Sequence, residues 1–199
     1  MKTLLIATAN KGKISDFRNF LTPKGIEVVS LLDINPNIDI VEDKDTYEGN
    51  ALKKAQEISE MLKLPVIADD SGIEVDALDG RPAVYSARYA GNHDDKANNA
   101  KMLQELQGVP LEKRTAKFVT CMAVYLPSGE KFTIRGELKG HILTEEKGNN
   151  GFAYDTLFKV EGTDRTMAEM DDNTRMKYSH RIKAIQNLIN SDFFKKHFN

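Results

Sequence analysis

Cysteine is almost absent from this sequence, and its scarcity excludes one class of structure. Cys121 is the single cysteine among 199 residues, so these residues cannot form a disulfide with one another. The thiol lies in the apolar stretch 118–124, where cysteine usually behaves as a small buried hydrophobic side chain. We therefore expect Cys121 to belong to the core and not to act as a nucleophile.

A surplus of one charge sign and a long apolar run are missing as well. The net charge is −2 and the pI is about 6.1, so no general basic field would attract nucleic acid or an acidic membrane. No apolar run approaches the roughly 20 residues that cross a bilayer. Polar residues 10–13 interrupt the apolar start before it reaches the length that a signal peptide needs. We expect a cytoplasmic protein without nucleic-acid or membrane partners.

The chain has neither repeats nor low-complexity segments, and no linker rich in proline, glycine or serine. Its 40% hydrophobic and 29% charged residues are typical of a globular protein. A chain of 199 residues is long enough to bury a substantial core. We therefore expect one domain over residues 1–199, which can consist of two lobes.

Apolar runs and helical periodicity alternate through the first half of the chain. The patterns predict strands over 3–8, 26–30, 65–68, 73–75, 116–126 and 131–137, and helices over 14–21, 51–62, 97–106 and 182–189. Thr46 is a candidate cap of the second helix, and the segments 33–45 and 147–151 are expected to be loops. A central hairpin within this alternation indicates an α/β protein whose mixed sheet is covered by helices on both faces.

The first candidate site is the connection between the first strand and the first helix, residues 8–13. Its sequence is Thr8-Ala9-Asn10-Lys11-Gly12-Lys13. Backbone N–H groups at a helix start, together with two lysines, suit a phosphate chain. The segment is not a P-loop, because Ala7 replaces its first glycine and Ile14 replaces its Ser or Thr. A plain turn with solvated lysines is an equal alternative on this segment alone.

The second candidate site is the stretch ADDSG, residues 68–72, in which two aspartates follow an apolar strand. Adjacent carboxylates in a partly buried place need a cation, which a divalent metal or a lysine could supply. Among metals, Mg²⁺ prefers carboxylate and phosphate oxygens. Asp70 could then bind the metal and accept a proton from water. Glu42 could be a second metal ligand, and Lys54 could balance the charge. The alternative is a polar turn in which Asp69 or Asp70 caps the next element.

The third candidate site lies near the C-terminus. Aromatic rings in Gly151-Phe152-Ala153-Tyr154-Asp155 could stack on a nucleobase, with Asp155 or the backbone at its edge. His180 and Arg181 could donate hydrogen bonds to the same base. The structural alternative places Phe152 and Tyr154 in the core, His180 in a purely structural role, and Arg181 on a solvated helix face.

Five segments in this order resemble the inosine triphosphate pyrophosphatase family, also called Ham1-like or RdgB-like non-canonical purine nucleoside triphosphate pyrophosphatases. They are TANKGK (8–13), TYEGNA (46–51), ADDSG with IEVDALDGRPAVYSARYAG (68–91), GFAYDTLF (151–158) and SHR (179–181). The resemblance covers nearly the whole chain. It implies the fold of that family, with two lobes and the active site between them.

The resemblance also implies a reaction. Members of the family use Mg²⁺ to hydrolyse ITP, dITP and XTP to the monophosphate and pyrophosphate, and are mainly cytosolic homodimers. By motif, the implied substrate-binding residues are Thr8, Ala9, Asn10, Lys11, Gly12, Lys13, Lys54, Ser71, Phe152, Ala153, Tyr154, Asp155, Arg175, His180 and Arg181. Asp70 matches the proton acceptor, and Glu42 and Asp70 match the metal ligands.

The chain departs from the family pattern at four positions. Arg175 replaces a lysine, Gly49 replaces a glutamate, and the segment GFGYDP carries Ala153 and Thr156 in place of its second glycine and its proline. We expect these changes to affect substrate preference more than reaction type. Two alternatives remain on the sequence alone: a kinase or NTPase that cleaves the β–γ bond, and a protein without catalysis, either a nucleotide-binding regulator or a structural dimer module.

Overall fold

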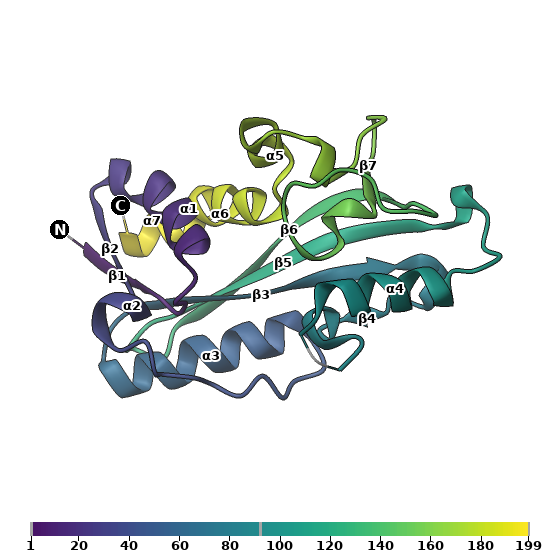
Figure 1. Cartoon of the computed structure of the whole chain (residues 1–199). Helices are drawn as coiled ribbons and strands as arrows, with labels where there is room; N and C mark the ends of the chain where they lie inside the picture. Colours follow the sequence, from purple (N-terminus) through teal and green to yellow (C-terminus); the bar gives the residue numbers. More distant parts are fainter. Residues whose placement is uncertain (1, 92, 199) are drawn as a thin grey trace. The chain divides into compact units, whose positions relative to one another are not determined.

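The structure is a computed structural model that describes residues 2–91 and 93–198 (Figure 1). The chain forms two compact units. Unit 1 contains Met1–Asp70, Thr120–Gly136 and Ile182–Asn199, and unit 2 contains Ser71–Val119 and Glu137–Arg181. The hydrogen-bonded strand order is β2-β1-β3-β5-β6-β7, with β4 beside β3.

Unit 1 is built on two parallel strand pairs. The strand β1 (Lys2–Ile6) pairs in parallel with β2 (Ile26–Ser30) and, through Leu5 and Ile6, with β3 (Val66–Val75). The strands β5 (Thr115–Tyr125) and β6 (Lys131–Ile142) also contribute residues to this unit. Parallel neighbours require crossover connections, which the helices between these strands provide.

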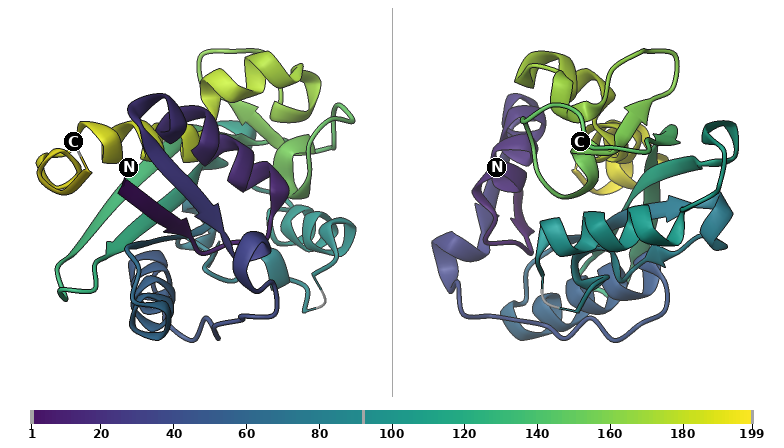
Figure 2. Two further views of the ribbon diagram at one scale, coloured as in Figure 1. Left: turned by 90° about the vertical axis from the view of Figure 1, so that its left-hand side faces the viewer. Right: turned by 45° about the vertical axis from the view of Figure 1, so that its right-hand side comes forward.

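Helices cover both faces of β1, because successive side chains of a strand point to opposite faces. Leu4 and Ile6 pack into a core with α1 (Lys11–Leu21), α6 (His180–Asn190) and α7 (Asp192–Phe198). Leu5 instead packs into a second core with α2 (Leu31–Ile34) and α3 (Tyr47–Leu62). Figures 1 and 2 show α1 and α3 on the two sides of these strands.

Unit 2 surrounds a separate core. Within it β4 (Pro82–Ala83) pairs antiparallel with β3, and β7 (Phe158–Val160) pairs antiparallel with β6. The helix α4 (Asp95–Glu105) contributes Met102 to this core, while α5 (Asp172–Tyr178) has no buried residues. The parallel and antiparallel pairs confirm the predicted mixed sheet with helices.

The structure corrects the interpretation of ADDSG as a turn at a strand end. The strand β3 continues from Val66 to Val75 through both aspartates, so the two predicted strand pieces are one element. A strand can carry adjacent aspartates because consecutive side chains point to opposite faces and can find separate partners. Cys121 is fully buried as expected, and burial raises the pKa of its thiol to about 12.

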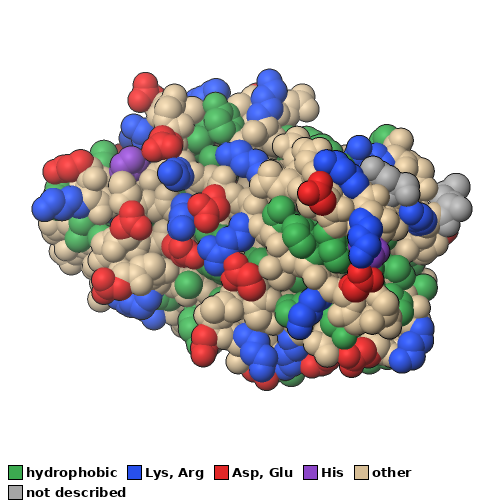
Figure 3. Space-filling model, turned by 180° about the vertical axis from the view of Figure 1, so that it is seen from behind, with side chains coloured by type: hydrophobic (Ala, Val, Ile, Leu, Met, Phe, Trp, Pro, Cys, Tyr) green, Lys and Arg blue, Asp and Glu red, His purple; other side chains and the backbone are tan. Residues whose placement is uncertain are grey.

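Charged side chains of both signs are mixed on the face of the molecule that Figure 3 shows. This distribution agrees with the small net charge of −2. Among residues 2–91 and 93–198, no helix combines the length and the apolar character of a membrane-spanning segment.

Candidate active site

The loop between β1 and α1 holds its shape through its own polar side chains. Asn10 caps α1, and its Oδ1 accepts a hydrogen bond of 3.1 Å from the backbone N–H of Lys13. Thr8 Oγ1 accepts from the N–H of Asn10 at 3.2 Å. A Cβ at Gly12 would lie 3.3 Å from the capping oxygen, so a glycine keeps this cap uncrowded. The helix start therefore directs its positive dipole end and first N–H groups outward.

Lys13 connects this helix start to β3. Its Nζ donates a hydrogen bond of 2.7 Å to Oδ2 of Asp69, whose side chain is only 3% exposed. Burying a carboxylate is costly unless a charged partner compensates it. The ion pair therefore satisfies Asp69 and fixes the ammonium of Lys13 next to the N-terminus of α1.

The carboxylate of Asp70 takes its partner from α3 and not from α1. Its Oδ2 accepts a hydrogen bond of 2.9 Å from Nδ2 of Asn50, a residue of α3 that is 1% exposed. Oδ1 of Asn50 accepts from the backbone N–H of Lys44 at 2.8 Å. A single buried amide thus connects the Asp70 carboxylate to the acidic loop before α3.

Lys54 lies one helical turn after Asn50 and contacts both the acidic loop before α3 and the backbone of β3. Its Nζ contacts the carboxylate of Glu42 and donates to the backbone oxygen of Asp69 at 3.3 Å. Burial lowers the pKa of Lys54, but the hydrogen bond with Glu42 and the charges of Glu42, Asp69 and Asp70 outweigh it and raise that pKa. Lys54 therefore stays charged at neutral pH.

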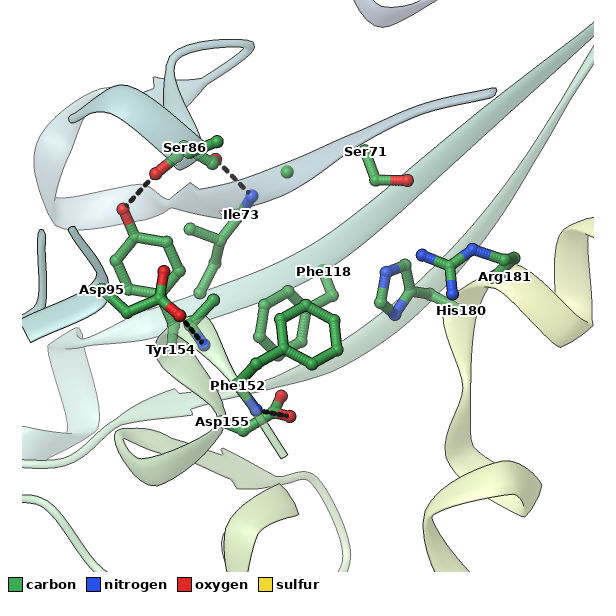
Figure 4. Close-up of a pocket in the computed structure, with 13 residues that line it drawn as sticks. Ser71, Ile73, Ser86, Asp95, Phe118, Phe152, Tyr154, Asp155, His180 and Arg181 are labelled. Carbon is green, nitrogen blue, oxygen red and sulfur yellow. Dashed lines mark hydrogen bonds between the residues drawn. The ribbon is translucent and has the colours of Figure 1, made fainter. Parts of the chain in front are cut away.

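Unit 2 contains a pocket whose lining is mainly apolar (Figure 4). The lining residues are Ser71, Gly72, Ile73, Ser86, Ala87, Asp95, Phe118, Phe152, Ala153, Tyr154, Asp155, His180 and Arg181. Phe118 and His180 stack with their ring centroids 5.2 Å apart. Phe152 is 68% exposed, which is unusual for a residue with a large apolar side chain. An exposed ring beside a stacked ring pair suits a flat aromatic ligand.

The two aromatic residues of the predicted segment both line the pocket but differ in burial. Tyr154 is buried, and its hydroxyl donates to the backbone oxygen of Ser86 at 2.7 Å. Tyr154 belongs to the core of unit 2 and also lines the pocket, so its contact with a substrate stays a prediction, whereas the core alternative is wrong for the exposed Phe152. The segment is a short 3₁₀ helix, Ala153–Thr156, and not a strand.

Asp155 forms a buried ion pair with Arg175. Nη2 of Arg175 donates to Oδ2 of Asp155 at 2.6 Å, and the same oxygen accepts from the N–H of Phe152 at 3.2 Å. Burial raises the pKa of Asp155, while its bonds to Phe152 and Arg175 act in the opposite direction. The carboxylate thus links Arg175 to the backbone of the exposed ring.

The structure brings the predicted residues together in two groups. In unit 1 it assembles the loop 8–13 with Glu42, Lys54 and Asp70, and in unit 2 it assembles Ser71, residues 152–155, His180 and Arg181 around the pocket. Arg175 does not line the pocket and contacts it through Asp155. The sequence patterns assign no role to Asn50, although it lies in the segment TYEGNA, and none to Phe118. Asn50 precedes Lys54 by four residues, a helical spacing that could have revealed it, whereas nothing distinguished Phe118 from other apolar strand residues.

The protein has an α/β fold in which a cationic helix start lies beside two carboxylates. It also has a pocket lined by aromatic rings. These features are typical of proteins that bind nucleotides. Comparisons with known proteins specify the family. The model of the Ham1 family matches residues 4–191. The chain belongs to this family.

Individual relatives match over nearly their whole length. A dITP/XTP pyrophosphatase of Bacillus licheniformis is 47% identical over 189 residues, which cover 94% of this chain and 96% of that protein. A dITP/XTP pyrophosphatase of Bacillus subtilis is 45% identical with the same coverage. Among solved structures, the Staphylococcus aureus Ham1 protein has a TM-score of 0.88 at 38% identity, covering 94% of this chain and 96% of that one. A HAM1 protein from Coxiella burnetii has the same TM-score and coverage at 31% identity.

Proposed function

We propose that the protein hydrolyses non-canonical purine nucleoside triphosphates, namely ITP, dITP and XTP, to the monophosphate and pyrophosphate. One observation carries the proposal: Lys13 at the start of α1 pairs with Asp69, while the next residue, Asp70, is held by the buried amide of Asn50. Asp70 is thus a carboxylate suited to proton transfer, and its neighbour Asp69 is bonded to Lys13, the lysine proposed to bind phosphate. The names of the relatives, dITP/XTP pyrophosphatase, support the same activity.

The residues present suit a Mg²⁺ ion that is shared with the substrate. Residues 2–91 and 93–198 contain no group of three or more His, Cys, Asp or Glu arranged to hold a metal by themselves. Mg²⁺ commonly takes only one or two carboxylates and completes its shell with phosphate oxygens and water. Asp70 and Glu42 are the two carboxylates that would hold it. Bound there, Mg²⁺ would neutralise charge on the phosphate oxygens.

Three charged side chains perform the reaction in this proposal. Asp70 orients the attacking water and accepts its proton, since the hydrogen bond from Asn50 fixes the orientation of the carboxylate. Lys13 and the N–H groups at the start of α1 bind the phosphates and stabilise the charge on departing pyrophosphate. Lys54, which stays protonated, adds positive charge to the same region.

The pocket of unit 2 binds the purine base. The exposed ring of Phe152 stacks on the base, and the Phe118–His180 pair forms a further aromatic surface. His180 and Arg181 supply donors for the 6-carbonyl of hypoxanthine and xanthine, which adenine lacks. A site built on such hydrogen bonds can reject the wrong base by a factor of 10⁴ or more.

We further propose that residues 1–199 act as one functional domain in a cytoplasmic homodimer. These statements rest on the family resemblance. Light scattering of the purified protein tests the dimer directly, because a dimer has twice the chain mass of 22.3 kDa.

The decisive experiment incubates the protein with Mg²⁺ and a panel of ITP, dITP, XTP, GTP and ATP, and measures pyrophosphate and orthophosphate separately. We expect pyrophosphate from ITP, dITP and XTP, and much less from GTP and ATP. Release of orthophosphate would identify the enzyme that cleaves the β–γ bond. Intact ITP after hours with Mg²⁺ would identify a regulator and would contradict the proposal.

A further inference from the structure

Ala153 has an unusual backbone conformation at the wall of the base pocket. Its φ is +52°, in the left-handed region that an L side chain adopts at a cost in free energy. The resembling family pattern has glycine at this position, for which the same conformation is much less costly. Ala153 also follows Phe152 directly. Other contacts must therefore stabilise the left-handed residue that sets the direction of the exposed ring.

Two side chains of α4 supply these contacts. The backbone N–H of Ala153 donates to Oδ2 of Asp95 at 2.9 Å, which Figure 4 marks with a dashed line. The backbone oxygen of Ala153 accepts from Nδ2 of Asn99 at 3.2 Å. Asp95 and Asn99 are four residues apart and therefore lie on one face of the helix, a turn from each other. They bond the donor and the acceptor of the same residue.

A second departure from the family pattern belongs to the same network. Nδ2 of Asn99 also donates to Oγ1 of Thr156 at 3.2 Å and to Oε1 of Glu146 at 2.5 Å. Oγ1 of Thr156 donates to Glu146 at 3.0 Å. The proline of the family pattern has no hydroxyl and could make neither contact. The alanine at 153 and the threonine at 156 are thus both bonded to Asn99.

We propose that Asp95 and Asn99 are positioning residues for base recognition, which clamp Ala153 in its left-handed conformation and so hold the Phe152 ring at the pocket. The inference rests on the proposed function, because it assigns that ring to the purine base. The clamp replaces the conformational freedom that a glycine at 153 would provide. Its ligand is the base of a purine nucleotide, and its effect is on substrate affinity.

A direct contact between Asp95 and the base is the competing explanation, since Asp95 also lines the pocket. The two explanations differ in what relieves the loss of Asp95. A clamp becomes unnecessary when position 153 is glycine, whereas a lost contact with the base stays lost. They also differ for Asp95→Asn, because an amide oxygen can still accept from the N–H of Ala153 but carries no charge.

The test measures kcat and KM for ITP in a mutant cycle of Asp95→Ala and Ala153→Gly. We expect Asp95→Ala to raise KM about tenfold, equivalent to about 1.4 kcal/mol, with kcat within threefold of the wild type. Ala153→Gly alone gives the reference KM of the glycine background, and the double variant should have a KM within threefold of that reference. Asp95→Asn should keep KM within twofold. Lys96→Ala, at the next position of α4, is the control and should change neither constant.

A second measurement does not depend on substrate. The chain contains no tryptophan, so Phe152→Trp introduces a single indole at the ring position. We expect Asp95→Ala to lower the fluorescence anisotropy of this indole in the nucleotide-free protein, and Lys96→Ala to leave it unchanged. If the wild type releases no pyrophosphate from any nucleotide, the proposed function fails while this anisotropy still decides whether the clamp exists.

Three results would overturn the inference. The first is an unchanged KM or an unchanged anisotropy in Asp95→Ala. The second is a double variant whose KM exceeds that of Ala153→Gly by as large a factor as the KM of Asp95→Ala exceeds that of the wild type. The third is an equal loss in Asp95→Asn, which would assign the effect to the charge at position 95.

Discussion

Asp69 and Asp70 are consecutive residues of β3, and their carboxylates take partners from helices on opposite faces of the strand. Asp69 pairs with Lys13 of α1, and Asp70 accepts from Asn50 of α3. The alternation of side chains along a strand therefore resolves the apparent repulsion between adjacent acids. It also gives the two carboxylates different environments, one neutralised by an ammonium and the other oriented by a neutral amide.

Replacing Asp70 with asparagine tests its role as proton acceptor. The amide has the same shape but cannot accept a proton from water, so we expect kcat for ITP to fall about 10²–10⁴-fold. The circular dichroism spectrum, and the affinity for a nucleotide measured without Mg²⁺, should change little. Asp164→Asn is the matched control, because it makes the same chemical change at a fully exposed carboxylate. Wild-type turnover in Asp70→Asn would remove this residue from the chemistry.

Asn50→Ala tests whether the buried amide positions Asp70. The substitution removes the bond to Asp70 and the bond to the backbone of Lys44, so the carboxylate loses its fixed orientation. We expect kcat to fall about 10–100-fold, with a smaller change in KM. Steady-state kinetics with ITP would measure both constants.

Ser59→Ala is the control for this prediction. Ser59 is also fully buried on α3, and its hydroxyl donates to the backbone oxygen of Leu64 at 2.6 Å. Its loss should cost about 1–3 kcal/mol of stability without changing kcat. If the two variants lose activity in proportion to stability, Asn50 has only a structural role.

Local sequence patterns correctly predicted the helices and strands whose bounds depend on a few neighbouring residues. The helix α3 begins after its predicted cap Thr46, whose side chain accepts from the N–H of Gly49. The strand β2 has its predicted bounds, Ile26–Ser30. The strand β3 was predicted as two pieces, because two aspartates and a glycine are rare in strands. Its continuity depends on Lys13 and Asn50, which are distant in sequence.

The candidate site was predictable by residue type but not by contact. The resemblance pointed to residues 152–155 as one segment, yet Phe152 is exposed and Tyr154 is buried. Burial depends on the packing of unit 2 and not on the local pattern. The contacts of Asp95 and Asn99 with Ala153 join residues more than 50 positions apart. No local propensity encodes such a pairing.

Gly151→Ala tests the ion pair behind Phe152. The φ of Gly151 is +81°, and an added Cβ would overlap Oδ2 of Asp155 and the guanidinium of Arg175. We expect a loss of about 1–2 kcal/mol from the backbone and a further 1–3 kcal/mol from the overlap. KM for ITP should rise as well, because Asp155 bonds to the N–H of Phe152. Urea denaturation and kinetics would measure the two effects.

Gly162→Ala provides the matched control for the backbone term. Gly162 also has a positive φ, +77°, but an added Cβ would have nothing within 4 Å. Gly162→Ala should lower the free energy of unfolding only by the backbone contribution, and its KM for ITP should not change. Equal losses of stability in the two variants would contradict an overlap with the ion pair.

The ion pair between Glu48 and Arg135 predicts a specific dependence of stability on pH. The hydrogen bond from Arg135 lowers the pKa of Glu48 in the folded state. A carboxyl group with a lowered pKa adds stability above the pKa of the unfolded state, 4.5, and this stability is lost as the pH falls through the pKa of the folded state.

We expect Glu48→Gln to cost about 1 kcal/mol at pH 7 and progressively less below pH 4.5, measured by urea denaturation at each pH. A constant difference between Glu48→Gln and the wild type from pH 7 to pH 3 would show that the lost bond does not depend on the charge of Glu48.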